Sequence, residues 1–340
     1  MKFSSPVALA TAISLASAAP TKTKVIKIDL SGVSVLGGMT FKIHQQPNKA
    51  FSGIRKGPLA LARAYSKFGA ALPDDLLSVV EQLLEELGLA GHRGGSSKNT
   101  TTDQVQNQAV EAAETVSSSF TSRASTDGLL GLAFSDLNTV TPNQQKTFFD
   151  NALSELASPL FTANLKQAEA GNYNFGFIDP TEYTGDISFV PVNASQGFWQ
   201  FESSGFRVDN GTAVSAPHVA IADTGTTLLF VPDAIAAAYY AGVDGAANSA
   251  LAGGYTYPCS AALPDFTALI GDYEALVPGS VIPFAPVDGD TFAGATTCFG
   301  GLQATPAGLP FSIYGDTFLK SQFVVFHGGN QQLGFASKPL

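Results

Sequence analysis

Apolar residues at helical spacing mark one segment in the first hundred residues. Pro73 and the acidic pair Asp74 and Asp75 begin it, and leucines and valines then recur every three or four positions up to Leu87, before Gly88. This spacing, with acidic residues at the start and a glycine at the end, predicts an amphipathic helix. The preceding residues are basic and interrupted by Pro and Gly, and they show no comparable pattern.

After residue 157 the pattern changes to short apolar runs separated by Gly, Asn, Asp and Pro, which is typical of strands and turns. Just before it, Gln144 to Leu156 has helical spacing. Pro232 and Asp233 start a short helix that continues through Tyr240, and Gly328 to Asn330 predicts a hairpin turn. The expected strands are Phe161 to Leu165, Tyr173 to Ile178, Ile187 to Val192, Phe198 to Val208, His218 to Ala222, Phe311 to Leu319 and Phe323 to Phe326.

The composition agrees with a folded chain that consists mainly of strands. Of the 340 residues, 45% are hydrophobic and only 14% are charged, which argues against global disorder. This length allows one large domain or two lobes with a substantial core. We therefore expect a mainly β fold with a few small helices.

The first residues have the composition of a secretory signal. Lys2 supplies a positive charge, Val7 to Leu15 form a short apolar segment, and Ala16 to Ala19 resemble a cleavage site. The apolar segment is too short to span a membrane. We therefore predict a signal peptide over residues 1–19 and a secreted protein with no membrane partner.

Other residues agree with export. Asn99, Asn193 and Asn210 each begin an N-glycosylation sequon. Cys259 and Cys298 are the only two cysteines of the chain, and in an oxidising compartment such a pair most simply forms one disulfide. The four histidines are far apart in sequence, so we expect no metal site and no cofactor.

Charge divides the chain into a basic part and an acidic part. Residues 1–98 contain 12 Lys or Arg and 6 Asp or Glu, whereas residues 99–340 contain 6 and 22. A basic propeptide bound to an acidic body explains this division, and the acidic body argues against nucleic acid as a partner. The flexible stretch Gly94 to Asn99 is the predicted junction. We therefore expect a propeptide over residues 20–98.

The segment Asp223-Thr224-Gly225 carries the candidate chemistry. It directly follows the apolar run His218 to Ala222, which would partly desolvate the carboxylate. The hydroxyl groups of Thr224 and Thr226 and the N–H groups of the turn can hold the carboxylate in its charged form. An isolated Asp-Thr-Gly is commonly only a turn, so the surrounding residues decide its interpretation.

Those surroundings closely resemble the second active-site motif of pepsin-like aspartic proteases, particularly the fungal secreted aspergillopepsins and penicillopepsins. The resemblance extends from about Gln108 to Leu340. It implies a pepsin-like acid protease fold, a peptide or protein substrate, a monomer and no cofactor. The segments that carry it are Ala222 to Leu228, Asp127 to Phe134, Ser158 to Phe161, Ser195 to Trp199 and Ile313 to Leu319.

The resemblance also implies roles for individual residues. Leu129 to Gly131 and Ile313 to Gly315 look like the two apolar segments that pass behind the catalytic loops, with Asp316 as a structural residue. The two cysteines occupy the position of the family's disulfide in the C-terminal lobe. Ala64 to Gly69 looks like the propeptide stretch whose lysine, here Lys67, blocks the catalytic carboxylates until acid protonates them.

The family's first catalytic motif is missing. Of the ten Asp in residues 1–222, none is followed by Thr-Gly or Ser-Gly. In the family, a hairpin of the N-terminal lobe called the flap closes the cleft and carries a tyrosine. Here Tyr65, in the predicted propeptide, is the only Tyr before Tyr173, so the flap tyrosine is absent too. We therefore interpret residues 99–157 as a remnant of the N-terminal lobe and residues 158–340 as a complete C-terminal lobe.

Three hypotheses remain open. The first is a secreted aspartic endopeptidase of which this chain is an inactive or incomplete version, since the mechanism needs two carboxylates that share a proton. The second is a non-catalytic protein that binds peptides by adding them to a strand edge. The third is a homodimer in which each chain supplies one Asp223.

Overall fold

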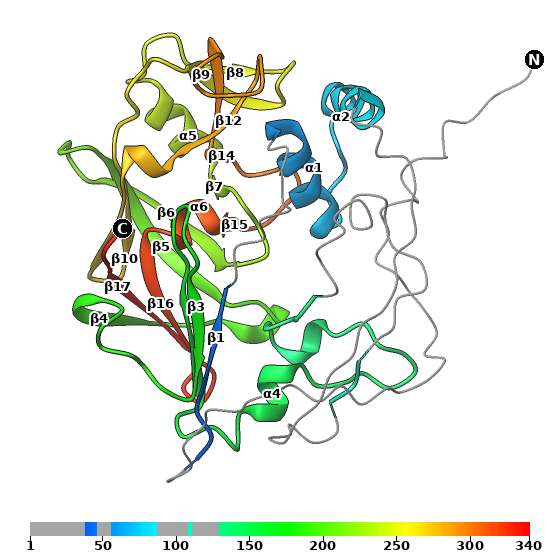
Figure 1. Cartoon of the computed structure of the whole chain (residues 1–340), viewed down its shortest axis with the longest axis vertical. Coiled ribbons are helices and arrows are strands. Elements are labelled where there is room, and N and C mark those ends of the chain that lie inside the picture. Colours follow the sequence, from blue (N-terminus) through cyan, green and yellow to red (C-terminus); the bar gives the residue numbers. More distant parts are fainter. Residues whose placement is uncertain (1–37, 46–55, 87–107, 111–128) are drawn as a thin grey trace, which may run out of the picture.

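The computed structural model of the chain describes residues 38–45, 56–86, 108–110 and 129–340 (Figure 1). The predicted signal peptide, the junction at 94–99 and the Asn99 sequon lie outside the described residues. Within them, strands form three sheets, as the pattern of short apolar runs predicts.

The six-stranded sheet joins the predicted propeptide to the rest of the protein. All of its pairings are antiparallel, and the strand order is β1-β3-β2-β16-β17-β4. Phe161 stacks on Phe326 and Phe175 in its core. The strands are β1 (Phe41–His44), β2 (Leu160–Asn164), β3 (Asn172–Phe175), β4 (Thr184–Pro191), β16 (Gln322–His327) and β17 (Gln332–Ser337).

The seven-stranded sheet contains the strand that leads to Asp223. Its order is β11-β10-β5-β6-β15-β7-β14, and β6 and β15 run parallel, so their carboxyl ends lie together. The strands are β5 (Gln200–Val208), β6 (Val214–Ala222), β7 (Leu229–Val231), β10 (Phe266–Ile270), β11 (Tyr273–Val277), β14 (Leu302–Ala304) and β15 (Ser312–Tyr314).

The smallest sheet contains the disulfide. Its order is β12-β13-β9-β8, and Cys298 in β13 is bonded to Cys259, directly after β9. Nearby, Tyr239 and Tyr240 of α5 (Asp233–Tyr240), the predicted helix, are buried. The strands are β8 (Ala247–Ser249), β9 (Gly254–Pro258), β12 (Pro283–Pro286) and β13 (Thr297–Gly300), and the short 3-10 helices are η1 (Ser135–Leu137), η2 (Ala194–Gln196) and η3 (Gly279–Val281).

Two helices of the predicted propeptide pack on the body of the protein. Helix α2 (Asp74–Glu86) is the helix that the spacing predicts, and α1 (Gly57–Lys67) precedes it. Figure 1 shows both on one side of the molecule, with α1 near β7, β14 and β15. They share an apolar cluster with the seven-stranded sheet, which holds α1 in place; its members include Leu59, Leu61, Ala64, Tyr65, Leu76, Ile221, Phe230 and Ile313.

Helix α1 was not predicted. Gly57 and Pro58 indicate a break when they are read in sequence, but proline fits the first turn of a helix, where its missing N–H is not needed. Strand β1 was not predicted either. Its four residues carry too short a pattern, and its pairing depends on β3, more than a hundred residues away.

Two predicted elements differ from the structure. In Gln144 to Leu156, only α4 (Phe148–Ala152) is an α-helix, and the Thr147 side chain accepts a hydrogen bond from the Asp150 N–H at its start. The expected strand Phe311 to Leu319 ends at β15 and continues as helix α6 (Asp316–Leu319). The chain turns at Gly315, where a Cβ would lie 2.3 Å from the carbonyl oxygen of Thr226.

None of the helices in the described part of the chain has the length and apolar character needed to cross a membrane.

Candidate active site

Asp223 lies at the carboxyl end of β6, in the middle of the seven-stranded sheet. Its N–H donates to the carbonyl oxygen of Tyr314 at the end of β15, 3.2 Å away. The preceding Ala222 is buried and donates its N–H to Trp199. The apolar strand thus places the Asp223 carboxylate where its side chain is only 16% exposed.

The turn after Asp223 holds the carboxylate as the sequence predicts. The Gly225 N–H donates to Oδ1 at 3.0 Å, and the Thr226 hydroxyl donates to Oδ2 at 2.6 Å. Each carboxylate oxygen therefore accepts a hydrogen bond from its own turn, which fixes the orientation of the group.

Lys67 contacts both oxygens of the same carboxylate. Its Nζ lies 2.7 Å from Oδ1 and 2.6 Å from Oδ2 of Asp223. Lys67 is the last residue of α1, and packing of that helix on the sheet brings the ammonium to this position. A Cβ at Gly225 would lie 2.7 Å from the Lys67 Nζ, so glycine leaves room for the ammonium.

A second segment supports the loop from behind. The N–H groups of Asp316 and Thr317 donate to the carbonyl oxygens of Thr226 and Thr227, at 2.7 and 2.9 Å. This segment, which includes Gly315, passes behind the Asp223 loop as the resemblance implies.

Asp316 is a partly buried carboxyl close to the site, with a side chain that is 26% exposed. Burial raises its pKa to about 6, the charge of Lys320 opposes that shift, and the charge of Asp223 adds to it. The Lys320 ammonium lies 3.6 Å from Asp316 Oδ2. Asp316 is the first residue of α6, directly after the turn at Gly315.

The proposed N-lobe counterpart, Leu129 to Gly131, has a different environment. The Leu129 side chain is 88% exposed and that of Leu130 is 50% exposed. Neither leucine is packed behind a catalytic loop in the described part of the chain, so the position that the resemblance implies for this segment is not seen there.

Sequence reasoning missed several neighbours of the site. Tyr173 of β3 lies near Thr224 and interacts with it, and burial raises the pKa of its phenol. Phe68, directly after Lys67, has its ring centroid 6.0 Å from that of Phe198 and 5.6 Å from that of Phe311. Phe68 and Phe198 lie inside segments that the resemblance singles out, but neither segment indicates that the two rings meet, because that contact depends on the tertiary fold.

The remaining predicted residues lie elsewhere. Cys259 and Cys298 form the expected disulfide. Asn193 and Asn210 are exposed, as glycosylation would require, and the Asn193 side chain accepts the Ser195 N–H at 3.1 Å. Among the described residues, no group of three or more His, Cys, Asp and Glu side chains could hold a metal ion.

Comparison with known proteins assigns the chain to a family. The model of the eukaryotic aspartyl protease family matches residues 98–338. The chain belongs to this family. The match includes the Asp223 loop and the segment behind it, and it begins after helices α1 and α2.

Several curated fungal proteins are similar over the same region. Penicillopepsin-3 of Penicillium janthinellum is 53% identical over 232 residues, 68% of this chain and 57% of the relative. Endothiapepsin of Cryphonectria parasitica is 53% identical over 235 residues, 69% of this chain and 55% of the relative. Aspergillopepsin-1 of Aspergillus oryzae is 50% identical over 234 residues, 69% of this chain and 57% of the relative. The chain thus spans little more than half the length of these relatives.

A solved structure supports the fold. The aspartic proteinase from Irpex lacteus superposes with a TM-score of 0.52 at 23% sequence identity, and the match covers 63% of this chain and 68% of that one. At this identity the likeness concerns the fold alone. It agrees with the mainly β, pepsin-like fold that the sequence predicts.

Proposed function

We propose that Asp223 is one of the two carboxylates of a secreted aspartic endopeptidase, and that Lys67 keeps it latent. The contact of the Lys67 ammonium with both oxygens of Asp223 carries this proposal. The Asp223 carboxylate is oriented by its own turn, and the ammonium of Lys67 at the end of α1 neutralises its charge. This is the arrangement expected of an inhibited catalytic group. Family membership and the named relatives support the peptidase assignment.

The reaction needs a second carboxylate. In aspartic peptidases one carboxylate takes a proton from water while the other, protonated, polarises the carbonyl of the peptide bond. The chain contains a single Asp-Thr-Gly and no Asp-Ser-Gly. We therefore propose that this chain supplies one half of the site and does not hydrolyse peptides by itself.

Transplanting the matched region into a full-length relative tests the role of Asp223. In penicillopepsin-3, the region aligned with this chain is replaced by residues 108–340, so that the relative supplies the missing half. The chimera is expected to cleave denatured protein at acid pH, and pepstatin is expected to inhibit it. Asp223→Asn in the chimera is expected to lower kcat by at least about a thousandfold, since it removes the proton-transfer group. A fully active Asp223→Asn chimera would overturn the assignment.

An assay of the chain itself tests its proposed inactivity. At acid pH the chain and its Asp223→Asn variant are expected to show the same background cleavage. Pepstatin-sensitive cleavage that depends on Asp223 would contradict single-chain inactivity. Sedimentation would then show whether two copies pair to supply two carboxylates.

A further inference from the structure

Strand β1 is an edge strand held by one neighbour. It occupies one end of the six-stranded sheet and pairs only with β3, with Lys42 opposite Asn174. Residues 1–37 and 46–55, on either side of its short segment, lie outside the described residues. The contacts that hold β1 therefore show what the edge of β3 recognises.

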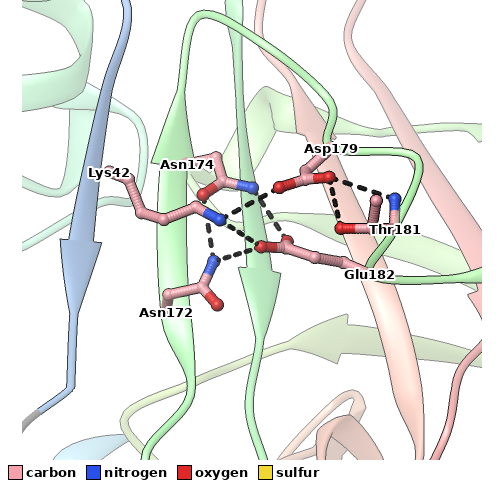
Figure 2. A network of polar contacts seen from close by, with 6 residues as sticks. All are labelled: Lys42, Asn172, Asn174, Asp179, Thr181 and Glu182. Atoms are coloured by element: carbon pink, nitrogen blue, oxygen red, sulfur yellow. Dashed lines mark hydrogen bonds and ion pairs between the residues drawn. The ribbon is translucent and has the colours of Figure 1, made fainter.

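Two carboxylates receive the Lys42 side chain. Figure 2 shows Lys42 extending from β1 over β3 toward Asp179 and Glu182, which belong to the segment after β3. Its Nζ lies 2.7 Å from Glu182 Oε1 and 3.1 Å from Asp179 Oδ2. A single nitrogen bridging two carboxylates suits a lysine ammonium better than a planar guanidinium.

Groups outside β1 orient these carboxylates. Asn172 and Asn174 donate to the two oxygens of Glu182, at 2.9 and 2.8 Å. The Thr181 hydroxyl and N–H donate to Asp179 Oδ1, at 2.6 and 3.0 Å. These two hydrogen bonds are the main reason that the pKa of Asp179 falls to about 2, and Lys42 adds less. The acceptor group is therefore organised by β3 and the segment that follows it.

Burial makes this acceptor group selective for a cation. The side chain of Glu182 is only 8% exposed. A buried carboxylate without a positive partner is strongly destabilising. A peptide that pairs with β3 but lacks an ammonium at this position would leave Glu182 in that state.

The residues beside Lys42 define the opposite face of the bound strand. Phe41 stacks on Phe175, with ring centroids 4.5 Å apart, and meets Phe148 edge-on. Ile43 also packs against the core. Because side chains alternate along a strand, a slip by one residue would place Lys42 in this apolar core.

We propose that the edge of β3, together with Asp179 and Glu182, is a docking site for extended peptides that carry a lysine between two apolar residues. Strand β1 is its resident occupant. Backbone pairing with an open strand edge supplies general affinity, and the side-chain positions supply specificity. The lysine fixes both the identity and the register of the bound segment.

Peptide exchange in the full chain tests the proposal. A protease recognition sequence is inserted within residues 46–55, and cleavage there leaves β1 on a separate fragment. A fluorescent peptide with the sequence of residues 38–45 is then added, alongside the same peptide with norleucine in place of lysine. The lysine peptide is expected to displace the fragment and to bind about tenfold or more tightly than the norleucine peptide, the effect of a charge-assisted hydrogen bond.

A variant pair locates the effect. Glu182→Gln is expected to abolish the preference for lysine, whereas Glu274→Gln, which alters an exposed carboxylate paired with Arg207 on another sheet, is expected to keep it. Equal binding of the two peptides to the unaltered protein would overturn the proposal, as would failure to take up either peptide. The two-peptide comparison decides even if Glu182→Gln fails to fold. The assay needs no catalysis, so its result is separate from that of the chimera.

Discussion

The contact between Lys67 and Asp223 joins two residues that are 156 positions apart in sequence. Each could be identified from the sequence because each lies in a short motif, Ala64 to Gly69 for the lysine and Asp223 to Thr227 for the aspartate. Tyr173 could not be identified in this way. It lies near Thr224 only because β3 passes near the Asp223 loop, and nothing in the residues around Tyr173 indicates that.

Replacing the lysine should have a measurable cost. Lys67→Met leaves Asp223 without its cation, and we expect it to lower the free energy of unfolding by about 1 kcal/mol, since Lys67 is partly exposed and solvent screens the pair. Denaturant titration at neutral pH measures this difference. The matched control is Lys166→Met, which removes an exposed pair with Glu169 and is expected to change stability by less than about 0.5 kcal/mol. Equal effects of the two substitutions would contradict a specific role for Lys67.

Asp316 predicts a pH dependence of stability. Its pKa is raised from 3.8 to about 6, so the folded protein binds an extra proton between these values, and stability falls as pH rises through that range. Above about pH 6 the free energy of unfolding is expected to be lower by about 2–3 kcal/mol. Asp316→Asn should remove this part of the pH profile in chemical denaturation, while Asp244→Asn, at an exposed carboxyl, should retain it. An unchanged profile in Asp316→Asn would contradict the raised pKa.

Among the elements, those with strong local patterns were predicted and those that depend on distant partners were not. Helix α2 has regular leucine spacing, and α5 starts at Pro232 and Asp233, so both followed from the sequence. Strand β1 needs β3, and α6 needs the turn at Gly315, which is required by the close approach of Thr226. Tertiary contacts therefore decided the elements that the local pattern could not.

The disulfide next to β9 and β13 should contribute strongly to stability. It closes a loop with a sequence separation of 39. Replacing both cysteines with alanine is expected to lower the free energy of unfolding by about 3–4 kcal/mol, because the unfolded chain regains the entropy of that loop. Calorimetry of the double variant checks this value. Reduction of the unaltered protein should shift its melting temperature in the same direction, and an unshifted transition would show that the bond contributes little.

At the scale of the whole molecule, helices α1 and α2 and strand β1 form part of the folded body instead of a separate domain. The charge division predicted that a basic segment would bind an acidic one. It did not reveal that the segment uses one strand in a sheet, two helices in an apolar cluster and an ammonium at a carboxylate. Net charge indicates attraction, but shape and register depend on individual side chains.

Salt should affect this association only partly. The Debye length falls from about 10 Å at 0.1 M salt to about 3 Å at 1 M, so long-range attraction between the basic and acidic parts is screened. The apolar cluster around α1 does not depend on charge. Limited proteolysis of residues 56–86 should therefore accelerate only a few-fold in 1 M sodium chloride, and complete loss of protection would contradict the apolar contribution.

Zero-length cross-linking measures the central contact most directly. A carbodiimide joins an amine and a carboxylate only when they touch, and the Lys67 Nζ lies 2.6 Å from Asp223 Oδ2. Mass spectrometry of the cross-linked and digested protein is expected to find an amide bond between Lys67 and Asp223, and Lys67→Met should eliminate that product. Joining of Lys67 to other carboxylates, with Asp223 unlinked, would contradict the latent arrangement.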